Sequence, residues 1–251
     1  MSSNESLQFY RLAEYYDALV AQKNYRSEVG QLERLARRFG QSKGRTWLDV
    51  ACGTGRHLEF LRRTRPVCGV DLSPEMLRVA RRRLPGVPLV SGDMRSFRLG
   101  KEFDVVTCLY SAIGHLRTEA DLRRTFRNFA RHLKPGGVAI VEPWIDPTEF
   151  HREMIHLVTH RGREGTIVRL AYSRRRGKHS VIRYHYLIGE PGRGIRHLEE
   201  TDIGLLVPRK RLLELMAQGG LQARFLRRGL PTGRGLLVGT KPKERAVIAP
   251  S

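Results

Sequence analysis

Apolar and polar residues form two kinds of pattern along the first 145 residues. Short apolar runs predict buried strands at 47–50, 67–70, 89–91, 101–109 and 138–141. The segments between them carry apolar residues every three or four positions, which predicts helices. Strands that alternate with helices form a parallel sheet covered on both faces. The expected fold class is therefore α/β, with a Rossmann-like, doubly wound, mostly parallel sheet.

The pattern changes after residue 146, where strand-like runs follow one another without a helix between them. Short turns separate these runs, and turns of this length join antiparallel strands. The runs lie at 155–160, 166–172, 180–188 and 196–207. We therefore expect an inserted antiparallel β subdomain. Beyond it, the pattern predicts a helix at 208–218 and strands at 221–227 and 235–240.

The predicted elements divide the chain into five parts. Two amphipathic helices, predicted at 7–20 and 24–39, precede the first strand. A helical segment at this place can close over a bound ligand and exclude water. The expected parts are an N-terminal helical lid (1–40), the first part of the sheet domain (41–145), the antiparallel insertion over the substrate site (146–207), the last helix and strands of the sheet domain (208–240) and a mobile tail (241–251).

A glycine turn follows the first predicted strand. Gly53 and Gly55 have no Cβ atom, so the backbone can bend sharply there and approach a ligand. A dinucleotide fingerprint needs a third glycine three residues later to accommodate a pyrophosphate, but Leu58 occupies that position. The turn therefore favours S-adenosylmethionine, which has no phosphate, over NAD.

Acidic residues stand at or just after the ends of three predicted strands. The carboxyl ends of parallel strands meet at one edge of a sheet, where such folds bind ligands. Asp49 precedes the glycine turn and is expected near the ammonium end of the cofactor. Asp71 can accept hydrogen bonds from both hydroxyls of a ribose, and Asp93 suits the exocyclic amine of adenine. Together they predict an adenosyl site.

The chain is strongly basic, with 46 Lys and Arg against 25 Asp and Glu and a formal net charge of +21. Such a charge ordinarily points to a nucleic-acid partner. Here the arginines are spread along predicted helices, and no RNA-binding module accompanies them. Solvated helix faces are the favoured interpretation, and nucleic acid is disfavoured as a partner.

The cysteine and hydropathy patterns predict a cytoplasmic protein. Cys52, Cys68 and Cys108 lie in or beside predicted core strands without a CxxC pair, which indicates reduced packing residues. The histidines show no metal-ligand spacing, so no metal is expected. No apolar run approaches the ~18 residues of a membrane span, and no secretion signal is visible.

Three motifs resemble those of class I S-adenosylmethionine-dependent methyltransferases: LDVACGTG, GVDLSPEML and GDM, although Ala51 replaces the usual first glycine. Further motifs, of which SAIGHL, VEPW and GRGL are the narrowest, are similar to those of the dTDP-3-amino-3,6-dideoxyhexose N,N-dimethyltransferases, which complete sugars such as desosamine and mycaminose. These motifs are SAIGHL (111–116), PGGV (135–138), VEPW (141–144), YHY (184–186), GIRH (194–197) and GRGL (233–236). The resemblance covers nearly all of residues 14–239. It implies N-methylation of a nucleotide-linked amino sugar, and it favours a homodimer.

The resemblance also implies which residues form the site. Cofactor contacts are expected from Tyr16, Tyr25, Asp49, Ala51, Gly53, Gly55, Asp71, Leu72, Met76, Asp93, Met94 and Leu109. Substrate contacts are expected from Tyr10, Trp144, Tyr184, Tyr186 and Arg234. The chain departs from the family at Ile145 and at 228–232, near the expected acceptor site, which leaves the exact sugar and nucleotide open.

His115 is the candidate catalytic residue, on the loop after the fourth strand. An alkylammonium cannot attack a methyl group until it loses a proton, and a histidine titrating near ~6.5 is well matched to accept it. Two alternatives stay open. His115 can serve only to hydrogen-bond the loop, and water or a backbone carbonyl can take the proton.

Three other interpretations of the whole chain remain. It can be another small-molecule methyltransferase of natural-product biosynthesis. It can be an RNA methyltransferase, which the basic surface alone supports. It can also be a binding module of methyltransferase fold without activity, which a failure to bind S-adenosylmethionine would favour.

Overall fold

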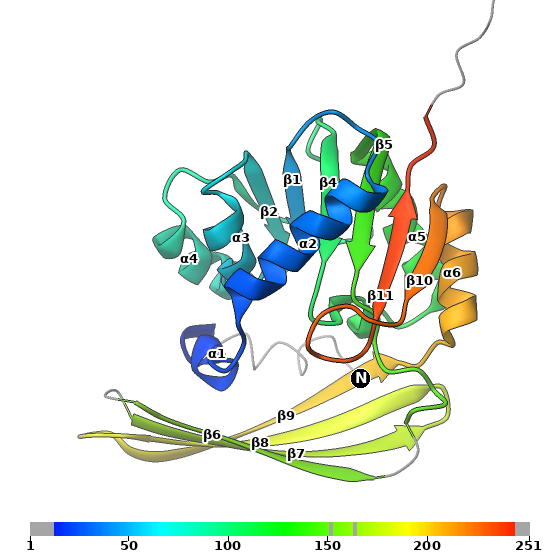
Figure 1. Ribbon diagram of the computed structural model, residues 1–251. Helices are drawn as coiled ribbons and strands as arrows, with labels where there is room; N and C mark the ends of the chain where they lie inside the picture. The colour runs from blue at the N-terminus through cyan, green and yellow to red at the C-terminus, as the bar shows by residue number, and fades with distance from the viewer. Residues whose placement is uncertain (1–12, 151–152, 163–164, 244–251) are drawn as a thin grey trace, which may run out of the picture.

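The computed structural model describes residues 13–150, 153–162 and 165–243 (Figure 1). Tyr10, the first part of the predicted helix at 7–20 and most of the predicted tail lie outside the described residues. Two sheets make up the described chain, one of seven strands and one of four. None of its helices combines the length and apolar character needed to cross a bilayer.

The seven-stranded sheet confirms the expected α/β class. Its strand order is β10-β11-β5-β4-β1-β2-β3. The five strands from β5 to β3 pair in parallel, whereas β11 pairs antiparallel with both β5 and β10. The strands are β1 (Trp47–Val50), β2 (Val67–Asp71), β3 (Leu89–Ser91), β4 (Phe103–Cys108), β5 (Leu133–Val141), β10 (Gln222–Leu226) and β11 (Leu236–Thr240). Every residue of β1, β2 and β4 is buried, as continuous apolar runs predict for central parallel strands.

Helices cover both faces of this sheet. Apolar residues of α2, α3 and α4 pack with one face, and those of α5 and α6 pack with the other. The helices are α2 (Tyr25–Phe39), α3 (Arg56–Leu61), α4 (Pro74–Arg83), α5 (Glu119–Arg131) and α6 (Arg209–Gln218). Side chains cap three of them: Asn24, Ser73 and Thr118 each accept a backbone N–H of the first turn.

The four-stranded sheet is the predicted insertion, with order β6-β7-β8-β9 and antiparallel pairing throughout. Its strands are β6 (Met154–Gly162), β7 (Gly165–Arg176), β8 (His179–Glu190) and β9 (Gly194–Leu205). In Figure 1 this sheet lies across the end of the main sheet, below it in the view. The short 3-10 helix η2 (Ala112–His115), which follows β4, contacts β9.

Helix α1 (Ala13–Leu19) bridges the two sheets. Leu19 packs with Ile167 and Tyr186 on one face of the inserted sheet. The Tyr15 hydroxyl donates a hydrogen bond to Glu190, with an oxygen–oxygen distance of 2.5 Å. On the other side, Asp17 accepts a hydrogen bond from Thr54 in the glycine turn and pairs with an arginine of α4.

Several predicted boundaries were wrong by a few residues. β5 begins at Leu133 rather than at residue 138, and β7 runs to Arg176 rather than to residue 172. The register of β4 against β5 shifts between Phe103 and Val105, and this irregularity accommodates the Pro-Gly-Gly segment of the PGGV motif inside β5. Pro208 caps α6 instead of starting it.

Candidate functional site

The two glycines of the turn after β1 have different roles. Both have positive φ, 56° at Gly53 and 78° at Gly55. A Cβ atom added to Gly53 would meet no protein atom within 4 Å, so this glycine borders open space. A Cβ atom on Gly55 would lie 2.6 Å from Leu84, so that glycine lets α3 pack against α4. Ala51 also has positive φ, at 57°, a conformation that costs a non-glycine residue energy.

Asp71 links the end of β2 to the glycine turn. Its Oδ2 accepts the Gly53 N–H at 2.7 Å, and its Oδ1 accepts the Ser73 N–H at 2.9 Å. Burial raises the pKa of this carboxyl, and the N–H groups act in the opposite direction. Each oxygen keeps a lone pair, so the carboxylate can still accept ribose hydroxyls. The next side chain, Leu72, is 60% exposed, which suits an apolar contact with a planar base.

Asp49 is a buried acid at the same edge of the sheet. It is 2% exposed and accepts a hydrogen bond from Thr107 at 2.7 Å, while Thr107 in turn accepts the Trp47 indole N–H. Burial raises the pKa of Asp49, although His57 and Thr107 oppose the shift. Among the residues that the structure describes, no cationic side chain hydrogen-bonds to Asp49. A buried carboxylate in this state favours a bound cation, which agrees with the expected ammonium group of the cofactor.

Asp93 is less available than the sequence suggested. The Arg95 guanidinium binds both of its carboxylate oxygens and lowers the pKa of Asp93. An adenine amino group would have to share this carboxylate. Met76 and Leu109 are 2% and 5% exposed and belong mainly to the core, whereas Met94 is partly buried.

Tyrosine rings gather beside the glycine turn, in agreement with a site for a cation. Tyr16 of α1 meets Tyr110 edge-on, with ring centroids 6.5 Å apart. The Lys23 ammonium lies 4.2 Å from the centre of Tyr110 and 5.1 Å from that of Tyr25. These faces attract positive charge, and a sulfonium is such a charge.

His115 at the end of η2 is held by a residue that sequence reasoning missed. Its Nδ1 lies 3.0 Å from Oδ1 of Asp202 on β9. The side chain is half exposed, so only a partial loss of hydration works against the charged imidazole, and the charge and hydrogen bond of Asp202 outweigh it and raise the pKa of His115. Because a carboxylate only accepts hydrogen bonds, Nδ1 carries the hydrogen and Nε2 is left to interact with a substrate.

The loop between β4 and η2 is strained. Tyr110 and Ser111 have φ of 52° and 59°, an uncommon conformation for residues with side chains. Glu142, fully buried at the end of β5, accepts the Tyr110 N–H at 2.7 Å and the Thr232 hydroxyl at 2.5 Å. Glu142 therefore fixes the direction in which this loop leaves the sheet.

The predicted substrate residues fall into two groups. Arg234 donates to the Ser111 hydroxyl at 2.7 Å, and its guanidinium lies 4.8 Å from the centre of Trp144. The Trp144 indole donates to Ser180 of β8, which joins the main sheet to the insertion. Tyr184 and Tyr186 stack on the face of β8 toward α1, with centroids 6.0 Å apart.

The outer face of the inserted sheet carries a cluster that linear spacing could not indicate. Pairing of β8 with β9 brings His185, His197 and Glu199 together, and their ligand atoms all lie within 4.8 Å of one another. These side chains are at least partly exposed and point away from Tyr184 and Tyr186.

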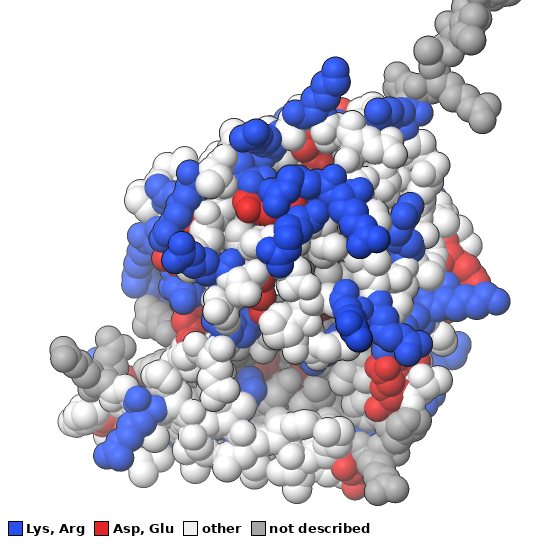
Figure 2. Space-filling model, viewed as in Figure 1, with Lys and Arg blue, Asp and Glu red and all other residues white. Residues whose placement is uncertain are grey.

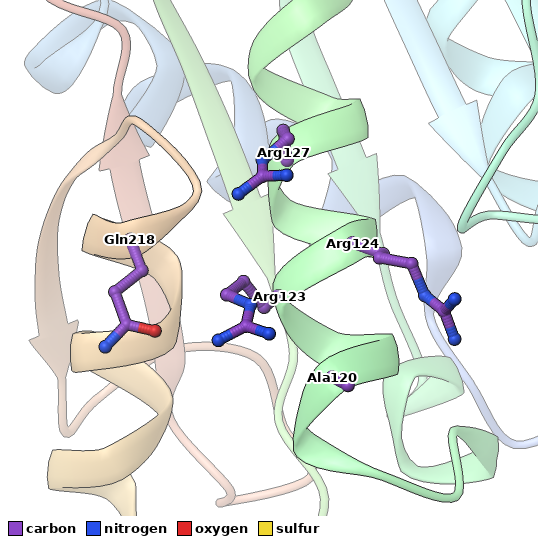
Figure 3. Close-up of a pocket in the computed structure, with 5 residues that line it drawn as sticks. All are labelled: Ala120, Arg123, Arg124, Arg127 and Gln218. Atoms are coloured by element: carbon purple, nitrogen blue, oxygen red, sulfur yellow. The ribbon is translucent and has the colours of Figure 1, made fainter.

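Basic side chains are unevenly distributed over the surface. Figure 2 shows many of them over the main sheet domain, whereas the inserted sheet is mostly uncharged in this view. An open hollow of about 500 Å³ lies between α5 and α6. Arg123 and Arg127 extend there toward Gln218, and Arg124 extends away (Figure 3). No predicted cofactor residue lines this hollow, so we place the site by its acids and glycines instead.

Comparison with known proteins adds independent information. Residues 48–137 match the model of a methyltransferase domain family. The chain is 42% identical over 232 residues to the dTDP-3-amino-3,6-dideoxy-alpha-D-glucopyranose N,N-dimethyltransferase of Streptomyces fradiae, covering 91% of this chain and 90% of that protein. It is 41% identical over 233 residues to the dTDP-4-amino-2,3,4,6-tetradeoxy-D-glucose N,N-dimethyltransferase of Saccharopolyspora spinosa, covering 91% and 92%.

A solved structure is similar over almost the whole chain. It is that of CalS10 with S-adenosylmethionine bound, an amino pentose methyltransferase from Micromonospora echinaspora involved in calicheamicin biosynthesis. The two chains are 35% identical, the TM-score is 0.81, and the match covers 96% of this chain and all of the other.

Proposed function

Because this chain belongs to the family of N,N-dimethyltransferases of dTDP-linked amino sugars, we propose that it methylates the amine of such a sugar with S-adenosylmethionine. Its relatives act on amines at different sugar positions, so the amine is the feature that their substrates share. The observation that carries the proposal is the His115–Asp202 contact, which joins the loop beside the cofactor acids to the inserted sheet.

The open space at Gly53, the remaining lone pairs of Asp71 and the exposed Leu72 fit an adenosyl group. S-adenosylmethionine supplies an activated methyl group when bound. The chain then has to orient the amine and remove its proton. Asp202 fixes the His115 ring, and Nε2 is the atom that accepts this proton. Correct placement alone can contribute ~7–11 kcal/mol to lowering the barrier.

We propose that α1 acts as the lid over the cofactor. Its contacts with Thr54 in the glycine turn and with Glu190 on the insertion hold both sides of the region where the tyrosines gather. Water excluded there cannot compete with the amine.

His115→Ala is expected to lower turnover by about a hundredfold, the scale of one general acid–base group, with little change in S-adenosylmethionine affinity. Steady-state kinetics and calorimetric titration with the cofactor measure the two quantities. His179→Ala, at the turn between β7 and β8, is the matched control. Unchanged turnover across the pH range would remove His115 from the role of base.

The function is tested by incubating the protein with labelled S-adenosylmethionine and a panel of dTDP-linked amino sugars, with tRNA as a competing acceptor. Label on a sugar supports the proposal, and mass spectrometry then gives the number of methyl groups. Label on tRNA, with binding that weakens steeply with salt, would instead support the RNA methyltransferase that the basic surface suggests. Label on neither would overturn the acceptor assignment.

We further propose a homodimer that works in the cytoplasm, in the biosynthesis of an antibiotic. The buried free thiols of Cys52, Cys68 and Cys108 suit a reducing compartment. The involvement of CalS10 in calicheamicin biosynthesis supports the biosynthetic role. Exposed apolar residues on the outer face of the inserted sheet support the dimer.

A further inference from the structure

Three side chains that can bind a metal ion meet on the outer face of the inserted sheet, and the proposed function uses none of them. His185 of β8 lies directly opposite Glu199 of β9 in the strand register, and His197 precedes Glu199 by two positions. All three side chains therefore point to the same side of the sheet. It is the only group of this kind among the residues that the structure describes.

The spacing of the three ligand atoms fits a single small cation. Nδ1 of His185 lies 3.2 Å from Nε2 of His197 and 3.4 Å from Oε1 of Glu199, and the last two atoms are 3.8 Å apart. A point equidistant from three atoms with these separations lies about 2.0 Å from each of them. Zinc binds histidine nitrogen at about 2.0–2.1 Å and carboxylate oxygen at about 2.0–2.2 Å. One ion can therefore contact all three atoms with little movement of the side chains.

The contact between the two imidazole rings also favours a cation. A neutral imidazole has one N–H group and one bare nitrogen, so the contact is favourable only when one ring donates and the other accepts. Protonation of both rings would set two N–H groups against each other. A metal ion lets both neutral rings use their lone pairs, and the Glu199 carboxylate offsets part of the charge of the ion.

The ligand chemistry selects the class of metal. Imidazole nitrogen suits zinc, nickel and copper, whereas magnesium and calcium prefer sites made of oxygen atoms. Leu170 of β7 lies opposite His185, and Leu187 of β8 lies opposite His197, so apolar side chains flank the cluster. An apolar surrounding strengthens the attraction between an ion and its charged ligand.

We propose that His185, His197 and Glu199 form a three-ligand site for Zn²⁺ or a divalent cation of similar chemistry, with water in the fourth position. The site departs from the sequence-based expectation of no metal, because strand pairing joins ligands that are 12 positions apart. It lies on the face opposite Tyr184 and Tyr186, so the ion links β8 to β9 and takes no part in methyl transfer.

Calorimetric titration of the untagged, EDTA-treated full chain with zinc chloride, in a buffer that contains magnesium, tests the site. Wild-type protein is expected to bind one ion per chain with a dissociation constant of about 1 μM or tighter, and zinc should raise its unfolding temperature. His197→Gln removes one ligand and should weaken binding more than about a hundredfold, because even the loss of an outer-shell partner costs about 10–100-fold.

Two further variants complete the experiment. Glu199→Gln keeps the size of the side chain without its charge and should weaken zinc binding about tenfold or more. His156→Gln removes an exposed histidine of β6, in the same sheet but outside the cluster, and should change nothing. Circular dichroism checks that every variant is folded.

Two results would overturn the inference. If wild-type protein binds zinc only at millimolar concentrations, the three side chains are no more than an exposed ion pair. If His197→Gln and Glu199→Gln bind zinc as wild-type protein does, the ion is held elsewhere. Neither result depends on methylation activity, so the inference and the proposed function stand or fall separately.

Discussion

His115 depends on Asp202 for both its orientation and its charge, which gives a prediction at the scale of single residues. Only neutral His115 can accept a proton, and its raised pKa places the acidic limb of the turnover profile above the ordinary value of 6.5. In Asp202→Asn the negative charge is gone, while the partial loss of hydration that disfavours the imidazolium remains. The limb should therefore move to lower pH, and turnover on its plateau should fall at least tenfold because the ring is less well oriented.

The profile of kcat against pH measures this shift, with S-adenosylmethionine affinity as the control for an intact cofactor site. The substrate amine has its own ionisation, which is the same for both proteins. If the limb stays in place when Asp202 is replaced, the amine sets it, and His115 only positions the substrate.

At the scale of elements, the sequence predicted the strands of the main sheet and their acidic ends but not the partners that complete the site. Asp49 and Asp71 could be found because parallel strands bring their carboxyl ends to one edge. His115 and Asp202 are 87 positions apart, and their contact depends on how the inserted sheet is placed against η2. Glu142 was noticed only as part of the VEPW motif, because a single glutamate gives no sign of which N–H and hydroxyl groups it accepts until its neighbours are known.

The start of β4 shows how a single acid joins three strands. Asp104 accepts the N–H and hydroxyl of Thr46, just before β1, and the ammonium of Lys134 in β5. Burial acts against its charge, but these partners prevail and lower the pKa of Asp104 to about 2. The lowered pKa contributes stability above the unfolded value near 3.8, and this contribution is lost as the pH falls toward 2.

Asp104→Asn should therefore reduce the free energy of unfolding by about 2 kcal/mol at pH 7. The difference from wild-type protein should shrink between pH 4 and pH 2, as judged by urea titrations at several pH values. Glu102→Gln, which affects an exposed ion pair with Lys241, should change stability by less than about 1 kcal/mol. Equal losses in the two variants would show that the hydrogen bonds of the buried Asp104 contribute no more to stability than an exposed ion pair does.

At the scale of the whole molecule, charge and apolar surface are separated. The net charge of +21 lies mainly on the main sheet domain, while the outer face of the inserted sheet exposes Ile155, Leu157 and Ile195 at 70%, 63% and 78%. Several large apolar side chains exposed together on one sheet face, beside the His185, His197 and Glu199 cluster, are unusual for a surface that stays in water. Two copies could cover these faces through one two-fold contact.

Leu157→Glu should therefore convert a wild-type dimer into a monomer in gel filtration with light scattering. Arg123→Gln in α5 makes the same change in net charge and should leave the dimer intact. Because two copies of charge +21 repel each other, added salt should strengthen an apolar contact by screening this repulsion. A wild-type monomer at all salt concentrations, or a dimer that salt dissociates, would rule out this face as the interface.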